Sequence, residues 1–173
     1  MLNVRYRTCK DINDIRTKKL LYIAWVRSRL EYASVVWSPH TKRNLNNLEQ
    51  VQRRATRFIL GREYPEYERL SKLNLLPLKY RRGINDVVFF FKCLKNISKL
   101  NILDYVSIRS CTKQLSNVDH LMLDVPFSRT DVFKSSFFVR ICHLWNYLPL
   151  SIRELKTLSI FRKNLIAFYY KLL

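Results

Sequence analysis

Apolar side chains recur every three to four residues over most of this chain, which predicts a mostly α-helical fold. The predicted helices cover about residues 14–37, 41–61, 66–73, 77–96, 135–147 and 159–173. Residues 97–131 are polar and mixed, and there only Leu121, Leu123 and Val125 alternate as in a short strand. We therefore expect a helical bundle in the first half, followed by a less regular α-rich extension with at most one short β element.

Residues at the predicted helix ends support this pattern. Asp14 and Thr41 are predicted N-caps, because their side-chain oxygens can accept hydrogen bonds from the first turn. Pro39 stops the first helix, since proline lacks a backbone donor. Gly61 suits the left-handed position after the second helix, and Pro77 suits the first turn of the fourth. The short connection between the first two helices predicts that they pack against each other.

The predicted helix over residues 41–61 has two chemically different sides. At about 100° per residue, its apolar side carries Leu45, Leu48, Val51, Ala55 and Ile59. Its basic side carries Lys42, Arg43, Arg53, Arg54 and Arg57. Only Glu49 lies near the basic side, whereas an ordinary solvated face mixes both signs to form i,i+4 pairs. The basic side is therefore a candidate anion-binding surface, with a merely solvated face as the alternative.

The net charge favours an anionic partner. The 173 residues include 32 Lys and Arg against 13 Asp and Glu, which gives a formal net charge of +19. Such a field favours polyanions, nucleic acid first and an anionic membrane surface second. The excess is larger in residues 1–96 than in residues 97–173, so the first half is the expected binding surface. Ten Phe, ten Tyr and three Trp exceed what a disordered polybasic tail carries, and we expect a folded core.

The chain lacks the sequence signs of an enzyme active site. Its two glycines, Gly61 and Gly83, are too few for a phosphate-cradling loop. The closest acidic set, Glu63, Glu66 and Glu68, lies among arginines and is better explained by solvated ion pairs than by metal binding. The histidines are isolated from one another and from any ligand set: His40, His120 and His143. We expect no catalytic, cofactor or metal site.

Cysteine spacing and hydropathy indicate an intracellular protein. Four widely spaced cysteines without a CxxC pair are present: Cys9, Cys93, Cys111 and Cys142. Neither a zinc site nor a disulfide framework is indicated, and reduced thiols are expected. No apolar run approaches the ~20 residues of a transmembrane helix, and the N-terminus lacks the apolar stretch of a signal peptide. We expect a soluble nuclear or cytoplasmic protein without a membrane partner.

Four strings share their order and spacing with one known family. They are LEYASVVWSP (30–39), LEQVQRRATRFILG (48–61), LNLLPLKYRR (73–82) and LWNYLP (144–149). Together they resemble the region downstream of the palm in reverse transcriptases (RNA-directed DNA polymerases) of jockey-like, non-LTR (LINE-type) retrotransposons. The resemblance covers nearly the whole chain from about residue 13 onward, and VQRRATR followed by Gly61 is fairly specific.

The resemblance implies a helical thumb-like domain over residues 1–97 and the C-terminal extension of the element over residues 98–173. In that family the thumb grips the RNA template and the growing DNA strand, whereas the palm performs catalysis. This sequence has no palm and no [YF]xDD string, so we expect no polymerase activity from it alone. It resembles a gene fragment or truncated open reading frame in which Met1 is an accidental start. The implied partners are template–primer RNA and DNA and the missing palm, and no oligomeric state is indicated.

Seven cations are the candidate nucleic-acid-binding residues: Lys42, Arg43, Arg53, Arg54, Arg57, Arg81 and Arg82. Guanidinium groups match phosphate oxygens, and a polymerase that accepts any sequence must contact the backbone rather than the bases. Arg81 and Arg82 begin a predicted helix, where cations oppose the helix dipole. A bound phosphate, or a salt bridge to Glu66 or Glu68, would offset that repulsion equally well.

Other notable side chains have structural interpretations. Trp37 and Trp145 could stack on bases, but both are predicted core residues because of their apolar neighbours. Arg27 and Arg29 are interpreted as structural, since Glu31 can neutralise Arg27 at i,i+4. Phe89 or Phe90 is expected to face the missing palm, since consecutive aromatics on a helix point in different directions.

Two alternative functions stay open. The chain can be a non-enzymatic helical protein-interaction module whose charge serves an acidic protein. It can also be a decayed fragment that binds polyanions without specificity. Preference for an RNA·DNA hybrid over heparin and over an acidic polypeptide distinguishes the thumb interpretation from both.

Overall fold

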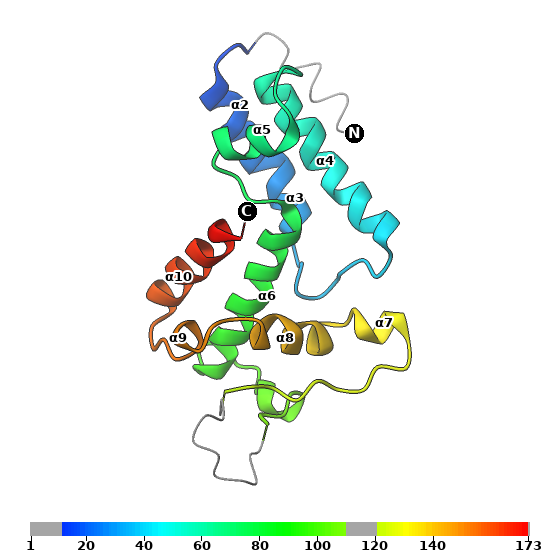
Figure 1. Ribbon diagram of the computed structural model, residues 1–173, viewed down its shortest axis with the longest axis vertical. Coiled ribbons are helices and arrows are strands. Elements are labelled where there is room, and N and C mark those ends of the chain that lie inside the picture. Colours follow the sequence, from blue (N-terminus) through cyan, green and yellow to red (C-terminus); the bar gives the residue numbers. More distant parts are fainter. Residues whose placement is uncertain (1–11, 110–120, 173) are drawn as a thin grey trace. The chain divides into compact units, whose positions relative to one another are not determined.

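The structure is a computed structural model that describes residues 12–109 and 121–172. It is mostly helical, as the apolar pattern predicts (Figure 1). Within these two ranges no strand forms, and the short β element predicted around Leu123 is a single antiparallel bridge between Ile108 and Leu123.

The described residues form two compact units. Unit 1 comprises residues 12–32 and 41–81, and unit 2 comprises residues 33–40, 82–109 and 121–172. Helix α6 (Leu78–Leu94) begins in unit 1 and continues in unit 2. The predicted domain boundary between residues 97 and 98 stays a prediction, because compact units are groups of contacts and not independently folding domains.

Unit 1 is a small helical bundle. Its helices are α2 (Ile15–Leu21), the π-helix η1 (Tyr22–Arg27), α3 (Ser28–Glu31), α4 (Lys42–Leu60), α5 (Glu66–Lys72) and the first turn of α6. Helix α4 contacts both α2 and α5, and Figure 1 shows these helices side by side. The buried core consists of Tyr22, Ala55, Ile59, Leu70, Leu73 and Leu75. The predicted packing of the first two helical segments is therefore confirmed.

The first helical run ends earlier than the sequence pattern predicts. It was expected to continue to Trp37, but α3 ends at Glu31. The carbonyl oxygens of Ser34 and Val35 accept hydrogen bonds from Arg140 Nη2 at 3.4 and 3.3 Å. These two carbonyl oxygens therefore accept hydrogen bonds within unit 2 and do not continue the backbone hydrogen bonds of the first helical run.

Both predicted N-caps are confirmed. The Asp14 carboxylate accepts a hydrogen bond from the backbone N–H of Thr17 at 2.9 Å, and Thr41 Oγ1 accepts one from Asn44 at 3.3 Å. Gly61 follows α4 with a φ of +85°, in the region that favours glycine. The bounds of α4 are thus determined by local sequence.

Replacing Thr41 with alanine is expected to lower the free energy of unfolding by about 1 kcal/mol. The substitution leaves the backbone N–H of Asn44 without its side-chain acceptor in the first turn of α4. Urea unfolding of the whole chain measures the difference. Thr41→Ser keeps the accepting oxygen and should unfold like the parent protein, so an equal loss in both variants would contradict the capping role.

Unit 2 is built around the remainder of α6. Its other helices are the 3-10 helix η2 (Ile102–Asp104), α7 (Asp131–Lys134), α8 (Phe137–Asn146), α9 (Leu150–Arg153) and α10 (Leu158–Lys171). Phe90 contacts the edge of Trp145 with a centroid separation of 4.9 Å, and Phe91 stacks on Phe161 at 4.0 Å. All four rings are buried, so these contacts join α8 and α10 to α6.

Two predictions about aromatic side chains change in unit 2. Phe90 is buried against Trp145, so it cannot face another domain. Phe89 contacts the ring of Phe137 at 5.6 Å but is only partly buried, so its predicted contact with a palm stays a prediction. Trp145 is a core residue as predicted, whereas Trp37 is 39% exposed.

Candidate nucleic-acid interface

The basic side of α4 is exposed along the helix in unit 1. Its exposed members are Lys42, Arg43, Arg53, Arg54 and Arg57, named here the α4 cationic face. The opposite side is buried and carries Gln52, Ala55, Thr56 and Ile59. From Lys42 to Arg57 the helix axis advances about 22 Å, at 1.5 Å per residue. A rigid core thus supports a long row of cations.

Carboxylates of the described residues neutralise little of the α4 cationic face. Arg53 Nε lies 2.7 Å from the Glu66 carboxylate in α5, and both side chains are partly exposed to solvent. Such a surface pair contributes about 0–1 kcal/mol, so a phosphate can compete for Arg53. The other four members form no ion pair with any residue in the described ranges. The face is open to an external anion.

The carboxylate of Glu49, the one acidic residue of α4, serves the fold instead of the cationic face. It accepts a hydrogen bond from the backbone N–H of Leu78 at 3.3 Å, at the start of α6. Burial raises the pKa of Glu49, and that hydrogen bond lowers it by a smaller amount. Glu49 therefore stabilises the first turn of α6 and is not available to pair with the neighbouring cations.

A buried polar network lies beneath α4 in unit 1. Arg81 is 5% exposed, and its Nη1 lies 2.6 Å from the carboxylate of Glu31. Arg81 Nη2 donates to the Tyr22 hydroxyl at 2.9 Å and also to the side-chain oxygen of Gln52. The Tyr22 hydroxyl donates to the same oxygen of Gln52 at 3.1 Å. These bonds tie the first helical run, α4 and α6 together.

The interior position of Arg81 and Arg82 removes both residues from the predicted phosphate-binding set. Arg82, in unit 2, is 6% exposed and donates from Nη2 to the carbonyl oxygen of Trp37 at 2.6 Å. Its guanidinium carbon lies 4.0 Å from the centroid of the Trp37 ring. Both cations lie near the start of α6, where other segments enclose them. Their guanidinium groups therefore stabilise the fold and are not available to a ligand.

Gln52 is the residue of this region that the sequence pattern does not identify. Its amide lies on the apolar side of α4 and is buried. Besides Tyr22 and Arg81, it bonds the carbonyl oxygen of Leu76, to which its Nε2 donates at 3.2 Å. A polar side chain among apolar positions was the available signal, because a buried amide requires hydrogen-bond partners.

The described residues offer no metal centre. No three His, Cys, Asp or Glu side chains in these ranges are placed to hold an ion together. Cys93 and Cys142 are buried free thiols, and burial raises the pKa of Cys142 to about 11. Cys9 and Cys111 lie outside the described residues. Among the helices of the described ranges, none has both the length and the apolar composition needed to cross a membrane.

Comparison of the chain with models of protein families, with curated proteins and with solved structures found no match. The α4 cationic face is therefore the feature from which a function is inferred.

Proposed function

We propose that the chain binds the sugar-phosphate backbone of nucleic acid through the α4 cationic face. It does so as the thumb and C-terminal extension of a non-LTR retrotransposon reverse transcriptase, a family in which the palm performs catalysis. The observation that carries the proposal is an exposed row of five cations, four of which have no carboxylate partner among the described residues. The proposed role of these cations is to hold a template–primer, not to extend it.

The dimensions of the face suit a nucleic-acid strand. Successive nucleotides of one strand are about 3.4 Å apart along a duplex axis, so a row of about 22 Å spans roughly six of them. Contacts from arginine and lysine to phosphates carry no sequence information. Binding through this face is therefore expected to be independent of sequence and strongly dependent on salt.

The string VQRRATR links the α4 cationic face to the family resemblance. Its arginines at positions 53, 54 and 57 are exposed, and its residues at positions 52, 55 and 56 are buried. The part of the chain that resembles the retrotransposon thumb most specifically therefore supplies three cations and the residues that anchor them.

Replacing Arg43, Arg54 and Arg57 together with alanine is expected to weaken binding to duplex DNA and to RNA·DNA hybrid of any sequence. Each phosphate contact contributes about −0.9 to the slope of log K against log salt for B-DNA, so the slope should flatten by about 2.7. Fluorescence anisotropy of a labelled duplex at several salt concentrations measures both quantities.

A second triple variant controls for net charge. Lys156, Arg162 and Lys163 are exposed in unit 2, and their replacement by alanine removes the same charge from another surface. This variant should keep the parent slope. Equal flattening in both variants would indicate binding by charge alone, and an unchanged slope in the α4 variant would refute the site. Equal retention of the parent chain on heparin and on hybrid would favour nonspecific polyanion binding.

A further inference from the structure

Arg53 differs from the other members of the α4 cationic face, because a carboxylate holds it. Its Nε lies 2.7 Å from the carboxylate of Glu66, the first residue of α5. Its terminal nitrogens, Nη1 and Nη2, have no hydrogen-bond partner among the described residues. The Arg53 side chain is 44% exposed, so these nitrogens are accessible from solvent. One part of the guanidinium group is therefore occupied, and its terminal edge is open.

A buried contact beside this pair fixes the position of Glu66. Arg69 of α5 is 5% exposed, and its Nε donates to Thr56 Oγ1 of α4 at 3.4 Å. Arg69 Nη1 also donates to the carbonyl oxygen of Tyr64, just before α5. The buried contact lies three residues beyond the Arg53 pair on both helices, so both contacts join the same sides of α4 and α5. The backbone of Glu66 is thus held beside Arg53.

Fixing the Arg53 side chain favours phosphate binding more than the charge of Glu66 opposes it. A free arginine side chain loses rotamer freedom when it binds, so holding it in place beforehand raises affinity by about tenfold. Glu66 repels a phosphate at the open edge, but two unit charges about 7 Å apart in water change affinity by about threefold or less. Both side chains are partly exposed, so dissolved salt weakens this repulsion further.

From this geometry we infer that Glu66 is a positioning residue of the α4 cationic face. Its carboxylate accepts a hydrogen bond from Arg53 Nε and directs Nη1 and Nη2 toward one backbone phosphate. The planar guanidinium group can donate to two phosphate oxygens at once. The phosphate therefore binds beside the intact ion pair and does not displace Glu66. This inference rests on the proposed function and identifies the residue that orients one of its phosphate contacts.

Two substitutions of Glu66 separate orientation from charge. Glu66→Ala and Glu66→Gln remove the same negative charge, but only glutamine keeps an oxygen that can accept from Arg53 Nε. Glu66→Ala is expected to bind a labelled duplex about 3- to 10-fold more weakly than Glu66→Gln, whose affinity should equal or exceed that of the parent chain. Fluorescence anisotropy with the whole chain measures both affinities. When Arg53 is also replaced by alanine, the two variants should bind equally, since no guanidinium group is left to orient.

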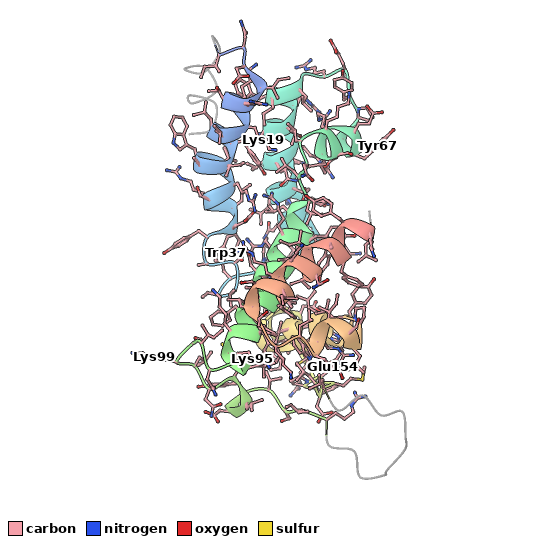
Figure 2. All side chains as sticks on the ribbon, turned by 90° about the vertical axis from the view of Figure 1, so that its left-hand side faces the viewer. Lys19, Trp37, Tyr67, Lys95, Lys99 and Glu154 are labelled. Atoms are coloured by element: carbon pink, nitrogen blue, oxygen red, sulfur yellow. The ribbon has the colours of Figure 1, made fainter. Side chains whose placement is uncertain are left out.

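Neighbouring residues provide matched controls. Glu63 is exposed before α5 and forms no ion pair within the described ranges, so Glu63→Ala and Glu63→Gln should bind the duplex equally. Tyr67 directly follows Glu66, is 71% exposed and projects outward from α5 (Figure 2). Tyr67→Ala should therefore bind like the parent chain. Circular dichroism and urea unfolding verify that the variants keep their helices and their stability.

Two results would overturn the positioning role of Glu66. Equal affinities of Glu66→Ala and Glu66→Gln would show that the accepting oxygen does not contribute to binding. A difference between them that persists without Arg53 would show that Glu66 acts through the fold of α5. Failure of the proposed function appears separately, as an unchanged salt slope in the Arg43, Arg54 and Arg57 variant, which keeps the Arg53 pair intact.

Discussion

Replacing Arg140 with alanine is expected to lower the free energy of unfolding by about 3–5 kcal/mol, because a buried carboxylate loses the cation that donates hydrogen bonds to it. Arg140 Nε lies 2.7 Å from Asp86, whose side chain is almost completely buried in unit 2. The same guanidinium group donates to the carbonyl oxygens of Ser34 and Val35 and, at 2.5 Å, of Ser135. One substitution thus removes a hydrogen-bond donor from a carboxylate and from three backbone acceptors.

The loss should depend on pH in a defined direction. Burial raises the pKa of Asp86 above its usual value of 3.8, and Arg140 opposes that shift. A carboxyl group whose pKa is higher in the folded state makes the protein less stable as pH rises from the unfolded pKa through the folded pKa. Without Arg140 the pKa rises further, so the variant should lose more stability at pH 7 than at pH 4. Chemical unfolding at both values measures this.

Two further variants show whether the Arg140 effect comes from the buried carboxylate. Adding Asp86→Asn to Arg140→Ala should recover part of the loss at pH 7, because no charge is left to bury. Arg162→Ala removes an exposed arginine of the same unit and should change the free energy of unfolding by less than about 0.5 kcal/mol. Equal losses for Arg140→Ala and Arg162→Ala would contradict the importance of the Asp86 pair.

Replacing Arg81 with alanine is expected to destabilise the protein by about 3 kcal/mol or more. The substitution removes the cation that joins Glu31, Tyr22 and Gln52 beneath α4. Tyr22 and Gln52 are buried, so their oxygens lose a donor that water cannot replace. Urea unfolding of the whole chain measures the loss, and nucleic-acid binding is compared under conditions where both proteins are folded.

The binding measurement distinguishes a structural role for Arg81 from a phosphate-binding role. A structural residue leaves the slope of log K against log salt unchanged, whereas a phosphate ligand would flatten it by about 0.9 with little effect on stability. Lys79→Ala is the matched control, because Lys79 is exposed two residues earlier on α6. A structural role for Arg81 would be contradicted if the Arg81 variant showed a flatter slope but was as stable as the Lys79 variant. Arg81 would then be assigned to the nucleic-acid interface.

Local features of the chain were sufficient for the mostly helical fold and for the α4 cationic face. The caps at Asp14 and Thr41 and the turn at Gly61 depend on neighbouring residues, so their signals are short and complete in sequence. The basic and apolar sides of α4 follow from helical periodicity, which is equally local. The core role of Trp145 was predictable for the same reason, since its neighbours are apolar.

The exposure of individual side chains required knowledge of segments distant in sequence. Nothing near Arg81 in the chain shows that Tyr22 and Gln52 enclose it, and nothing near Phe90 shows that Trp145 covers it. The exposure of Trp25 could not be predicted from the sequence either, because a tryptophan in a helical pattern is more often buried. Helix formation depends on residues within a few positions in sequence. Burial depends on which element, distant in sequence, packs against a given side of the helix.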